Sequence, residues 1–531
     1  MAMCFGRLTG AGTFRRCKAL LKRIARAAAV TIAALVAVAP ATQPVGSQGL
    51  ESGSPVTPVR YLVVIFQENV SFDHYFATYP YAANPGGEPR FEPASGTPTV
   101  NGLSGALLSA NPNSANPFRF ARSHAATCDQ NHRYTAEQLA YDHGLMDRFV
   151  EFTNHGAGMQ GSTPCGPNDV MGYFDGNTVT AVWNYAQHFA MSDNNFDTMF
   201  GSSTPGALHL IAGETHGATP ANYVEPAGID AVDGTLVYDI DPLLDDCSGS
   251  PRVNMTGRTV GDLLNDKGVT WGWFEGGFRP TSRTPGGAAV CGAQHRGSYG
   301  LPTPDYMPHH EPFQYFQSTA NPHHLPPTAV RMIGKTDQAS HQYDLDDFWA
   351  AAQTGSLPSV SFLKAPAYQD GHAGYSDPLA EQVFLAETIN RLQRTREWSA
   401  MAVIVTYDDS DGWYDHVMPP IVNRSDSPAD ALTGPGSCGP AAVGAYPGRC
   451  GYGPRLPLLM ISSFAKMNFV DHAVTDQTSI LRFIEDNWRL GRLGDQSFDA
   501  LAGSIEGMFS FGRGPRAPRL FLDPATGEPA R

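Results

Sequence analysis

Short, continuous runs of apolar residues recur along the chain, separated by longer stretches rich in glycine, proline and polar residues. The first run lies within residues 60–67 (RYLVVIFQ), and similar runs occupy 360–363, 401–406 and 457–461. Runs of this length, rich in β-branched and aromatic side chains and without polar alternation, are typical of strands buried on both faces. The pattern therefore predicts the interior strands of a central sheet.

Two segments with apolar residues at helical spacing alternate with these runs. One is predicted to begin at Asp377, a suitable N-cap, with Pro378 in the first turn, and the other is predicted to follow Asp476. The apolar positions are Leu385, Ile389 and Leu392 in the first helix and Ile480, Ile484 and Trp488 in the second. Strands that alternate with helices predict an α/β fold with a mainly parallel central sheet flanked by helices.

These elements lie within residues 60–490, which we interpret as one main domain. Residues 205–335 are rich in glycine, proline and aromatic residues but contain few long periodic stretches, so we expect a loop-rich insertion or cap over one edge of the sheet. Residues 42–59 have the composition of a linker, and residues 491–531 are expected to form an extended C-terminal tail.

The first 41 residues resemble an export signal. Basic residues gather at 15–26, an apolar stretch follows at 27–39, and the sequence Ala-Pro-Ala at 39–41 matches a cleavage site. The apolar stretch is shorter than the ~20 residues that a membrane-spanning helix needs, although an uncleaved anchor is the alternative. We therefore predict a protein exported to the periplasm or secreted, with no stable membrane span after cleavage.

Composition and charge restrict the partners. The chain of 531 residues is 42% hydrophobic, enough for a substantial core, and its 55 Gly and 42 Pro indicate many loops. Seven of the 36 basic residues and none of the 51 acidic residues lie in 1–41, so the remainder has a net charge of −22. Such an acidic body should repel nucleic acid and anionic membranes unless a metal ion overrides the field locally.

Six of the eight cysteines remain after removal of 1–41, and an even number in an exported protein predicts disulfides. Of the possible pairs, only Cys438–Cys450, across a loop rich in glycine and proline, is predicted specifically. The six are Cys128, Cys165, Cys247, Cys291, Cys438 and Cys450.

Oxygen ligands follow two of the predicted strands. Glu68-Asn69 ends the first apolar run, and Asp408-Asp409 follows the run at 401–406. Ligands gather at the carboxyl ends of the strands in open α/β sheets, and carboxylates crowded there repel one another until a divalent cation binds. Taken one pair at a time, ordinary strand termination and helix capping are the alternative.

Histidines and a hydroxyl-bearing turn complete the candidate chemistry. His132, His310 and His372 each lie near glycine, proline or acidic residues, and histidine can bind a phosphate oxygen or donate a proton. A single histidine is more often an ordinary hydrogen-bonded residue. Ser203 and Thr204 lie in a turn before an apolar helix start, where a hydroxyl would be accessible and an anion favoured, although a capping turn would look the same.

Four motifs, in order along residues 60–490, resemble the bacterial phospholipase C/acid phosphatase family, whose fold is alkaline-phosphatase-like. They are residues 68–76 (ENVSFDHYF), 203–206 (STPG), 368–378 (YQDGHAGYSDP) and 406–417 (TYDDSDGWYDHV). The resemblance makes 60–490 a phosphoesterase catalytic domain. It implies that Glu68, Asn69, Asp408 and Asp409 hold one divalent metal ion of unknown identity, that Ser203 is the nucleophile, and that His132, His310 and His372 contact the phosphate or the leaving group.

The sequence departs from the family pattern at two places. Ser202 stands where relatives often have proline, which leaves Ser203 and Thr204 as alternative nucleophiles. Gln477 stands where many relatives have histidine, and nearby His472 is a possible substitute. Many phospholipases of the family carry additional C-terminal β domains, for which the stretch 491–531 is too short, so the pattern is closer to the acid phosphatase branch.

The resemblance implies an exported, metal-dependent, acid-phosphatase-like hydrolase of phosphomonoesters that forms a phosphoserine, with His372 or His310 protonating the departing oxygen. A phospholipase C acting on the phosphodiester head groups of phospholipids would use the same site. A sulfatase is disfavoured because its cysteine signature is absent, and a non-enzymatic, exported cation-binding protein is the remaining alternative. The oligomeric state stays open.

Overall fold

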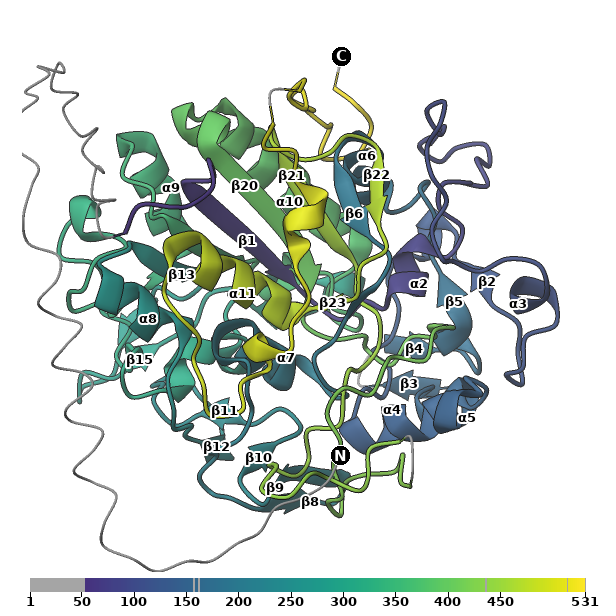
Figure 1. Cartoon of the computed structure of the whole chain (residues 1–531), viewed down its shortest axis with the longest axis horizontal. Helices are drawn as coiled ribbons and strands as arrows, with labels where there is room; N and C mark the ends of the chain where they lie inside the picture. The colour runs from purple at the N-terminus through teal and green to yellow at the C-terminus, as the bar shows by residue number, and fades with distance from the viewer. Residues whose placement is uncertain (1–52, 156–157, 161–162, 435–436, 513, 531) are drawn as a thin grey trace, which may run out of the picture. The chain divides into compact units, whose positions relative to one another are not determined.

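The structure, a computed structural model, describes residues 53–530 apart from 156–157, 161–162, 435–436 and 513. The predicted export signal (1–41) and most of the predicted linker therefore lie outside the described residues. Within the described part, no helix combines the length and the apolar character needed to cross a bilayer. Figure 1 shows the strands and helices of the described chain.

A mainly parallel sheet forms the centre of the described chain, as predicted. Its strands, in spatial order, are β18 (Gln342–Asp344), β13 (Trp271–Glu275), β19 (Val360–Lys364), β1 (Tyr61–Gln67), β20 (Met401–Tyr407), β21 (Leu458–Ser462), β6 (Ala190–Ser192) and β22 (Phe469–Asp471). Only β21 runs antiparallel to its neighbours in this sheet. The four runs predicted from the sequence are β1, β19, β20 and β21, which are adjacent in the middle of the sheet.

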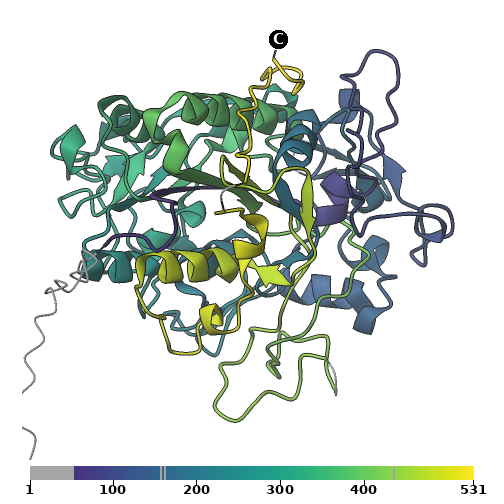
Figure 2. The same ribbon diagram turned by 45° about the horizontal axis from the view of Figure 1, so that its top comes forward.

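Helices cover both faces of the sheet. The α-helices of the described chain are α2 (Phe72–Phe76), α3 (Ala106–Ser109), α4 (Tyr134–Tyr141), α5 (Phe149–Phe152), α6 (Thr180–His188), α7 (Ser203–Ala212), α8 (Val260–Lys267), α9 (Leu345–Thr354), α10 (Pro378–Arg394) and α11 (Gln477–Trp488), and not all of them lie on the sheet. Figure 2 shows α9 and α10 on one side of the sheet and α11 on the other. Both predicted helices are confirmed, with Asp377 capping α10 and Asp476 capping α11.

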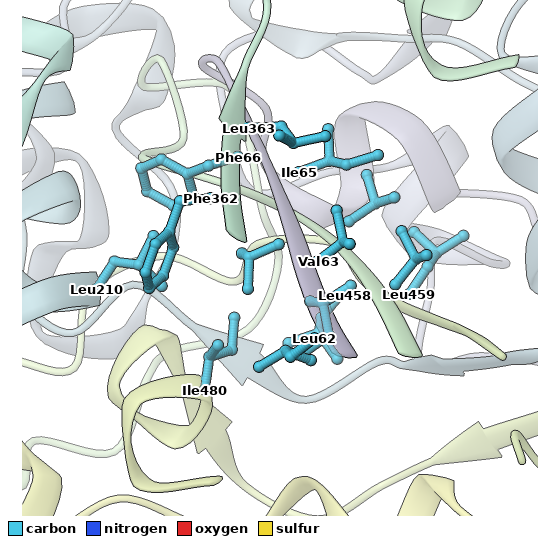
Figure 3. Close-up of a cluster of buried hydrophobic side chains, with 14 of the residues drawn as sticks. Leu62, Val63, Ile65, Phe66, Leu210, Phe362, Leu363, Leu458, Leu459 and Ile480 are labelled. Carbon is cyan, nitrogen blue, oxygen red and sulfur yellow. The ribbon is translucent and has the colours of Figure 1, made fainter. Parts of the chain in front are cut away.

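The core lies on both faces of the central strands. Successive side chains of β1 alternate between the faces: Figure 3 shows Phe66 toward Leu210 of α7, with Val63 and Ile65 on the opposite side. Leu62 to Phe66 are all at most 2% exposed, and burying one large aliphatic side chain contributes about 1.5–3 kcal/mol. Burial on both faces explains why these strands appear in the sequence as unbroken apolar runs.

The segment 205–335 is loop-rich only in part. Beyond its loops it supplies most of α7, all of α8 and the sheet strand β13, so the interpretation of this segment as an insertion or cap misses elements of the main domain. It also carries a small sheet of β8 (Tyr223–Glu225), β9 (Gly228–Val232) and β10 (Thr235–Leu236). In the tail, the backbone amides of Leu520 and Leu522 donate hydrogen bonds to Gln393 and Asn390 of α10.

Pairs of short strands lie outside the central sheet. They are β2 (Phe118–Arg119) with β5 (Gly172–Tyr173), β3 (Gly158–Gln160) with β4 (Thr163–Cys165), β7 (Asn195–Phe196) with β23 (Thr475–Asp476), β11 (Asp241–Pro242) with β12 (Arg252–Val253), β14 (Ser282–Arg283) with β15 (Ala289–Val290), and β16 (Gln294–Arg296) with β17 (Pro302–Pro304). Disulfides link Cys128 to Cys165, Cys247 to Cys291, and Cys438 to Cys450. The predicted Cys438–Cys450 pair is therefore confirmed.

Candidate active site

Two neighbouring parallel strands deliver oxygen ligands to one edge of the sheet. β1 and β20 stay in register up to Gln67 and Tyr407, so their next residues leave the sheet side by side. These residues are the predicted metal ligands Glu68, Asn69, Asp408 and Asp409, each at most 1% exposed. Asn69 has a positive φ of 56°, which turns the chain as it leaves β1, and its amide donates a 2.9 Å hydrogen bond to Asp408 Oδ1.

The hydroxyl of Ser203 lies among these ligands. Its Oγ is 3.2 Å from Glu68 Oε2, 3.3 Å from Asn69 Oδ1 and 3.0 Å from Asp409 Oδ2. Ser203 is the first residue of α7, so its oxygen lies at the positive end of the helix dipole, which favours negative charge there. Three segments far apart in the sequence thus meet at one point.

The neighbouring hydroxyl of Thr204 points elsewhere. Its Oγ1 lies 3.4 Å from the carbonyl oxygen of His309, and its amide donates to Asp239 Oδ1 at 2.8 Å. This arrangement favours Ser203 over Thr204 as the nucleophile. The expectation that the hydroxyl is accessible is wrong: Ser203 is 2% exposed because the two strand ends close around it.

The carboxylates at this site need a counter-charge. Burial and the charge of Asp408 raise the pKa of Glu68, and burial raises the pKa of Asp409. Burial opposes ionisation of Asp408 as well, but Lys364 and the amides of Asn69 and Asp409 outweigh it and lower the pKa of Asp408. When all three carboxylates ionise to bind a metal ion, one ammonium leaves two of their negative charges unbalanced.

The donor set fits a divalent cation. Every side-chain donor from the two strand ends is a carboxylate or amide oxygen, the chemistry that hard divalent cations prefer. Asp408 Oδ2 is buried without a hydrogen-bond partner, which leaves it available as a ligand. One divalent ion would also neutralise the two uncompensated charges. The residues at 68–69 and 408–409 therefore suit the single metal ion that the sequence predicts.

Two of the predicted histidines are neutral by virtue of their surroundings. His310 Nδ1 lies 3.3 Å from Glu68 Oε1, and burial lowers the pKa of His310 well below its ordinary value. Its Nε2 is buried without a hydrogen-bond partner. His372 donates its amide to Asp370 Oδ1 at 2.9 Å, and burial lowers the pKa of His372.

His132 has the opposite character. Its Nδ1 lies 3.1 Å from Asp411 Oδ1 and 3.4 Å from Asp129 Oδ1, and its ring centre is 6.5 Å from that of His372. Although burial opposes protonation, the carboxylates of Asp409, Asp411 and Asp129 raise the pKa of His132 well above its ordinary value. These carboxylates therefore favour the protonated form of this imidazole.

Comparison with known proteins agrees with this geometry. The model of the phosphoesterase family matches residues 59–491. The chain belongs to the phosphoesterase family. It is also 23% identical over 482 residues to phospholipase C B of Mycobacterium tuberculosis, covering 88% of this chain and 81% of that protein. It is 24% identical over 444 residues to non-hemolytic phospholipase C of Pseudomonas aeruginosa, covering 81% of this chain and 54% of that protein. It is 22% identical over 391 residues to non-specific phospholipase C6 of Arabidopsis thaliana, covering 71% of this chain and 58% of that protein.

The predicted resemblance to phospholipase C and acid phosphatase enzymes is thus confirmed at the level of the family. As a phosphoesterase, the protein is a hydrolase of phosphoric ester bonds, which sets aside the non-enzymatic interpretation. His472 does not replace the histidine expected near Gln477: its side chain is 68% exposed and bonds Asp193, so it lies on the surface, away from the buried cluster.

Sequence reasoning missed two residues of this candidate site. Lys364, the last residue of β19, is 1% exposed; its Nζ contacts Glu68 Oε1 and lies 3.6 Å from Asp408 Oδ2. The carboxylate of Asp370 lies within 4.8 Å of ligand atoms of Glu68 and His310. The available signal was positional, because Lys364 directly follows the predicted strand 360–363 at the same sheet edge as Glu68.

Proposed function

We propose that the protein hydrolyses phosphoric esters through a phosphoserine formed on Ser203. The observation that carries this proposal is the position of Ser203 Oγ, 3.0–3.3 Å from three candidate metal ligands. Glu68, Asn69, Asp408 and Asp409 would hold one divalent ion. When bound, such an ion supplies positive charge to the phosphoryl oxygens and lowers the pKa of a coordinated hydroxyl.

Residues of the chain carry out the remaining chemical steps. The Ser203 hydroxyl loses its proton to a neighbouring carboxylate and attacks phosphorus in line, while the bond to the leaving oxygen breaks. We assign proton donation to that oxygen to His132, since the carboxylates around it keep it protonated. This revises the expected role of His372 or His310, which burial keeps neutral and which fit phosphate binding instead. Water then displaces Ser203 from phosphorus.

Two classes of substrate suit this site. The resemblance of the four motifs to a family that includes acid phosphatases supports phosphomonoesters as substrates. The names of the relatives, all phospholipases C, favour the phosphodiester head groups of phospholipids. Values of kcat/KM for p-nitrophenyl phosphate and for phosphatidylcholine vesicles decide between them, since the preferred class should exceed the other by at least about a hundredfold.

The fold and the location are also part of this proposal. A nucleophile at a helix N-terminus beside the carboxyl ends of parallel strands supports an alkaline-phosphatase-like arrangement. The three disulfides and the signal-like residues 1–41 support export. N-terminal sequencing of protein recovered from the periplasm or the medium should begin after Ala41; recovery of the uncleaved chain in the cytosol would contradict export.

The nucleophile is tested by exchanging each neighbouring hydroxyl. Ser203→Ala should lower kcat/KM at least about a thousandfold, because it removes the atom that forms the covalent intermediate. Thr204→Ala is the matched control and should keep most of the activity, since its hydroxyl bonds the His309 carbonyl. Trapping of phosphate on the wild type and not on Ser203→Ala completes the test. Normal turnover by Ser203→Ala would reject the mechanism.

A further inference from the structure

The nucleophile and the metal ligands lie on separate segments that have to keep a fixed distance. Ser203 begins α7, whereas Asp408 and Asp409 lie in the turn after β20. An error of about 1 Å in that distance can slow a reaction a hundredfold. Contacts that join the two segments hold this distance.

Glu137 of α4 joins them directly. Its Oε2 accepts the amide hydrogen of Gly201, two residues before Ser203, at 2.9 Å. Its Oε1 accepts the hydroxyl of Ser410, the residue after Asp409, at 2.5 Å. The side chain is completely buried, so water cannot replace either bond.

Gln477, the first residue of α11, makes a second connection. Its amide nitrogen donates to the carbonyl oxygen of Asp408 at 2.5 Å and to that of Tyr407 at 3.3 Å. Its Oε1 accepts the amide hydrogen of Thr198, which precedes the nucleophile turn, at 3.3 Å. Gln477 is also completely buried. Gln477, which stands where many relatives have histidine, thus holds the turn that carries Asp408 and Asp409.

We propose that Glu137 and Gln477 are positioning residues that fix the distance between Ser203 and the metal ligands. The inference rests on the proposed role of Ser203 and adds two residues to it. The residues need different chemistry: position 137 has to accept the amide hydrogen of Gly201 and pair with the hydroxyl of Ser410, whereas position 477 has to donate to carbonyl oxygens. Partners that hold ligands in this way commonly change metal affinity 10–100-fold when they are removed.

Because the two positions need different chemistry, the test exchanges the two side-chain types: Glu137→Gln and Gln477→Glu, which are nearly the same size as the originals. Glu137→Gln keeps an acceptor for Gly201 and a group that can pair with Ser410, so kcat for p-nitrophenyl phosphate should fall less than about threefold. Gln477→Glu places a carboxylate against the carbonyl oxygens of Asp408 and Tyr407, so kcat should fall at least about thirtyfold. In Glu137→Ala, kcat should also fall at least about thirtyfold. KM should change less than about threefold in all three variants.

The second readout is Co²⁺ binding, measured by equilibrium dialysis. The affinity should weaken at least about tenfold in Gln477→Glu and in Glu137→Ala. Glu151→Ala and Gln353→Glu change exposed residues of the same types and should match the wild type. Ser410→Ala, which removes the same bond to Glu137, replaces Glu137→Ala if that variant does not fold.

The proposal is overturned if Gln477→Glu keeps kcat and Co²⁺ affinity within threefold of the wild type, or if Glu137→Gln loses as much kcat as Glu137→Ala. It is also overturned if the losses follow only the folded fraction seen by circular dichroism. A Ser203→Ala variant with normal turnover would instead reject the nucleophile assignment, and the Co²⁺ affinities would still test whether Glu137 and Gln477 hold the ligands.

Discussion

The charge at the site depends on one lysine. Lys364 contacts Glu68 and lies 3.6 Å from Asp408 Oδ2 while remaining 1% exposed. Burial opposes protonation, yet the charges of Glu68 and Asp408 raise the pKa of Lys364, so it stays an ammonium. When the three carboxylates ionise to bind a metal ion, this fixed cation leaves a net charge of −2, which one divalent ion would balance.

Lys364→Met tests this balance, since it removes the charge and keeps the length of the side chain. Breaking a buried ion pair by removing one partner costs about 3–5 kcal/mol, so the metal-free variant should lose that much free energy of unfolding. Added divalent ions should restore part of it, because the extra negative charge attracts them. Urea unfolding with and without a chelator measures both effects. Lys267→Met, at an exposed position of α8, is the control; equal stabilities of the two variants would contradict the prediction.

At this scale the sequence is informative where a residue type and a strand end coincide. The meeting of Glu68-Asn69 with Asp408-Asp409 could be predicted because these oxygen-bearing residues directly follow buried apolar runs. Lys364 was missed because a single lysine after a strand is usually solvated, and only the neighbouring carboxylates give it a role. The burial of Ser203 could not be predicted either, since it depends on two strand ends that meet only in three dimensions.

At the scale of elements, the approach of α7 to the end of β20 depends on one glycine. A Cβ atom at Gly206 would lie 2.0 Å from the carbonyl oxygen of Asp408 and 2.9 Å from Gln477 Nε2. No real contact is that short, and the nearest atom is backbone, which cannot move aside independently of the strand end. Gly206 therefore allows the helix that carries Ser203 to pack directly on the turn that carries Asp408 and Asp409.

Gly206→Ala should lower both activity and stability. Alanine favours a helix by about 0.8–1.0 kcal/mol over glycine, so a loss of stability would show that the steric clash outweighs the propensity. We expect a loss of about 1–3 kcal/mol in the free energy of unfolding and at least about a hundredfold in kcat/KM. Gly86→Ala, where a Cβ atom meets nothing within 4 Å, should match the wild type in both measurements. Normal activity in Gly206→Ala would show that α7 can shift without consequence.

The central elements could be predicted, but the strand β13 could not. Its sequence, WGWFE, lacks β-branched residues and contains Gly272, where a Cβ atom would lie 2.9 Å from the rings of Phe274 and Tyr343. The glycine makes room for large aromatic side chains from neighbouring positions, a reason that only the packed structure reveals. The three-residue strands β6, β18 and β22 are too short to give a pattern of their own. They form because β21, β13 and β6, respectively, offer them an edge.

At the scale of the whole molecule, disulfides hold the loop-rich segments that lie outside the central sheet. Cys247 and Cys291 are 44 residues apart, and Cys438 and Cys450 are 12 residues apart. None of these cysteines touches Ser203 or the candidate metal ligands in the described structure. Their effect should therefore fall mainly on the unfolded chain, whose freedom a cross-link restricts.

Removing each pair separately tests this view. If chain entropy dominates, the Cys247→Ala/Cys291→Ala variant should lose about 4 kcal/mol and the Cys438→Ala/Cys450→Ala variant about 3 kcal/mol in the free energy of unfolding, because the longer loop restricts the unfolded chain more. Both variants should keep kcat/KM within about threefold, since the elements that carry the site stay in place. Guanidinium unfolding and assays of the same samples measure the two quantities. A greater loss from the shorter loop would show that the disulfide acts through contacts in the folded state and not through the unfolded chain.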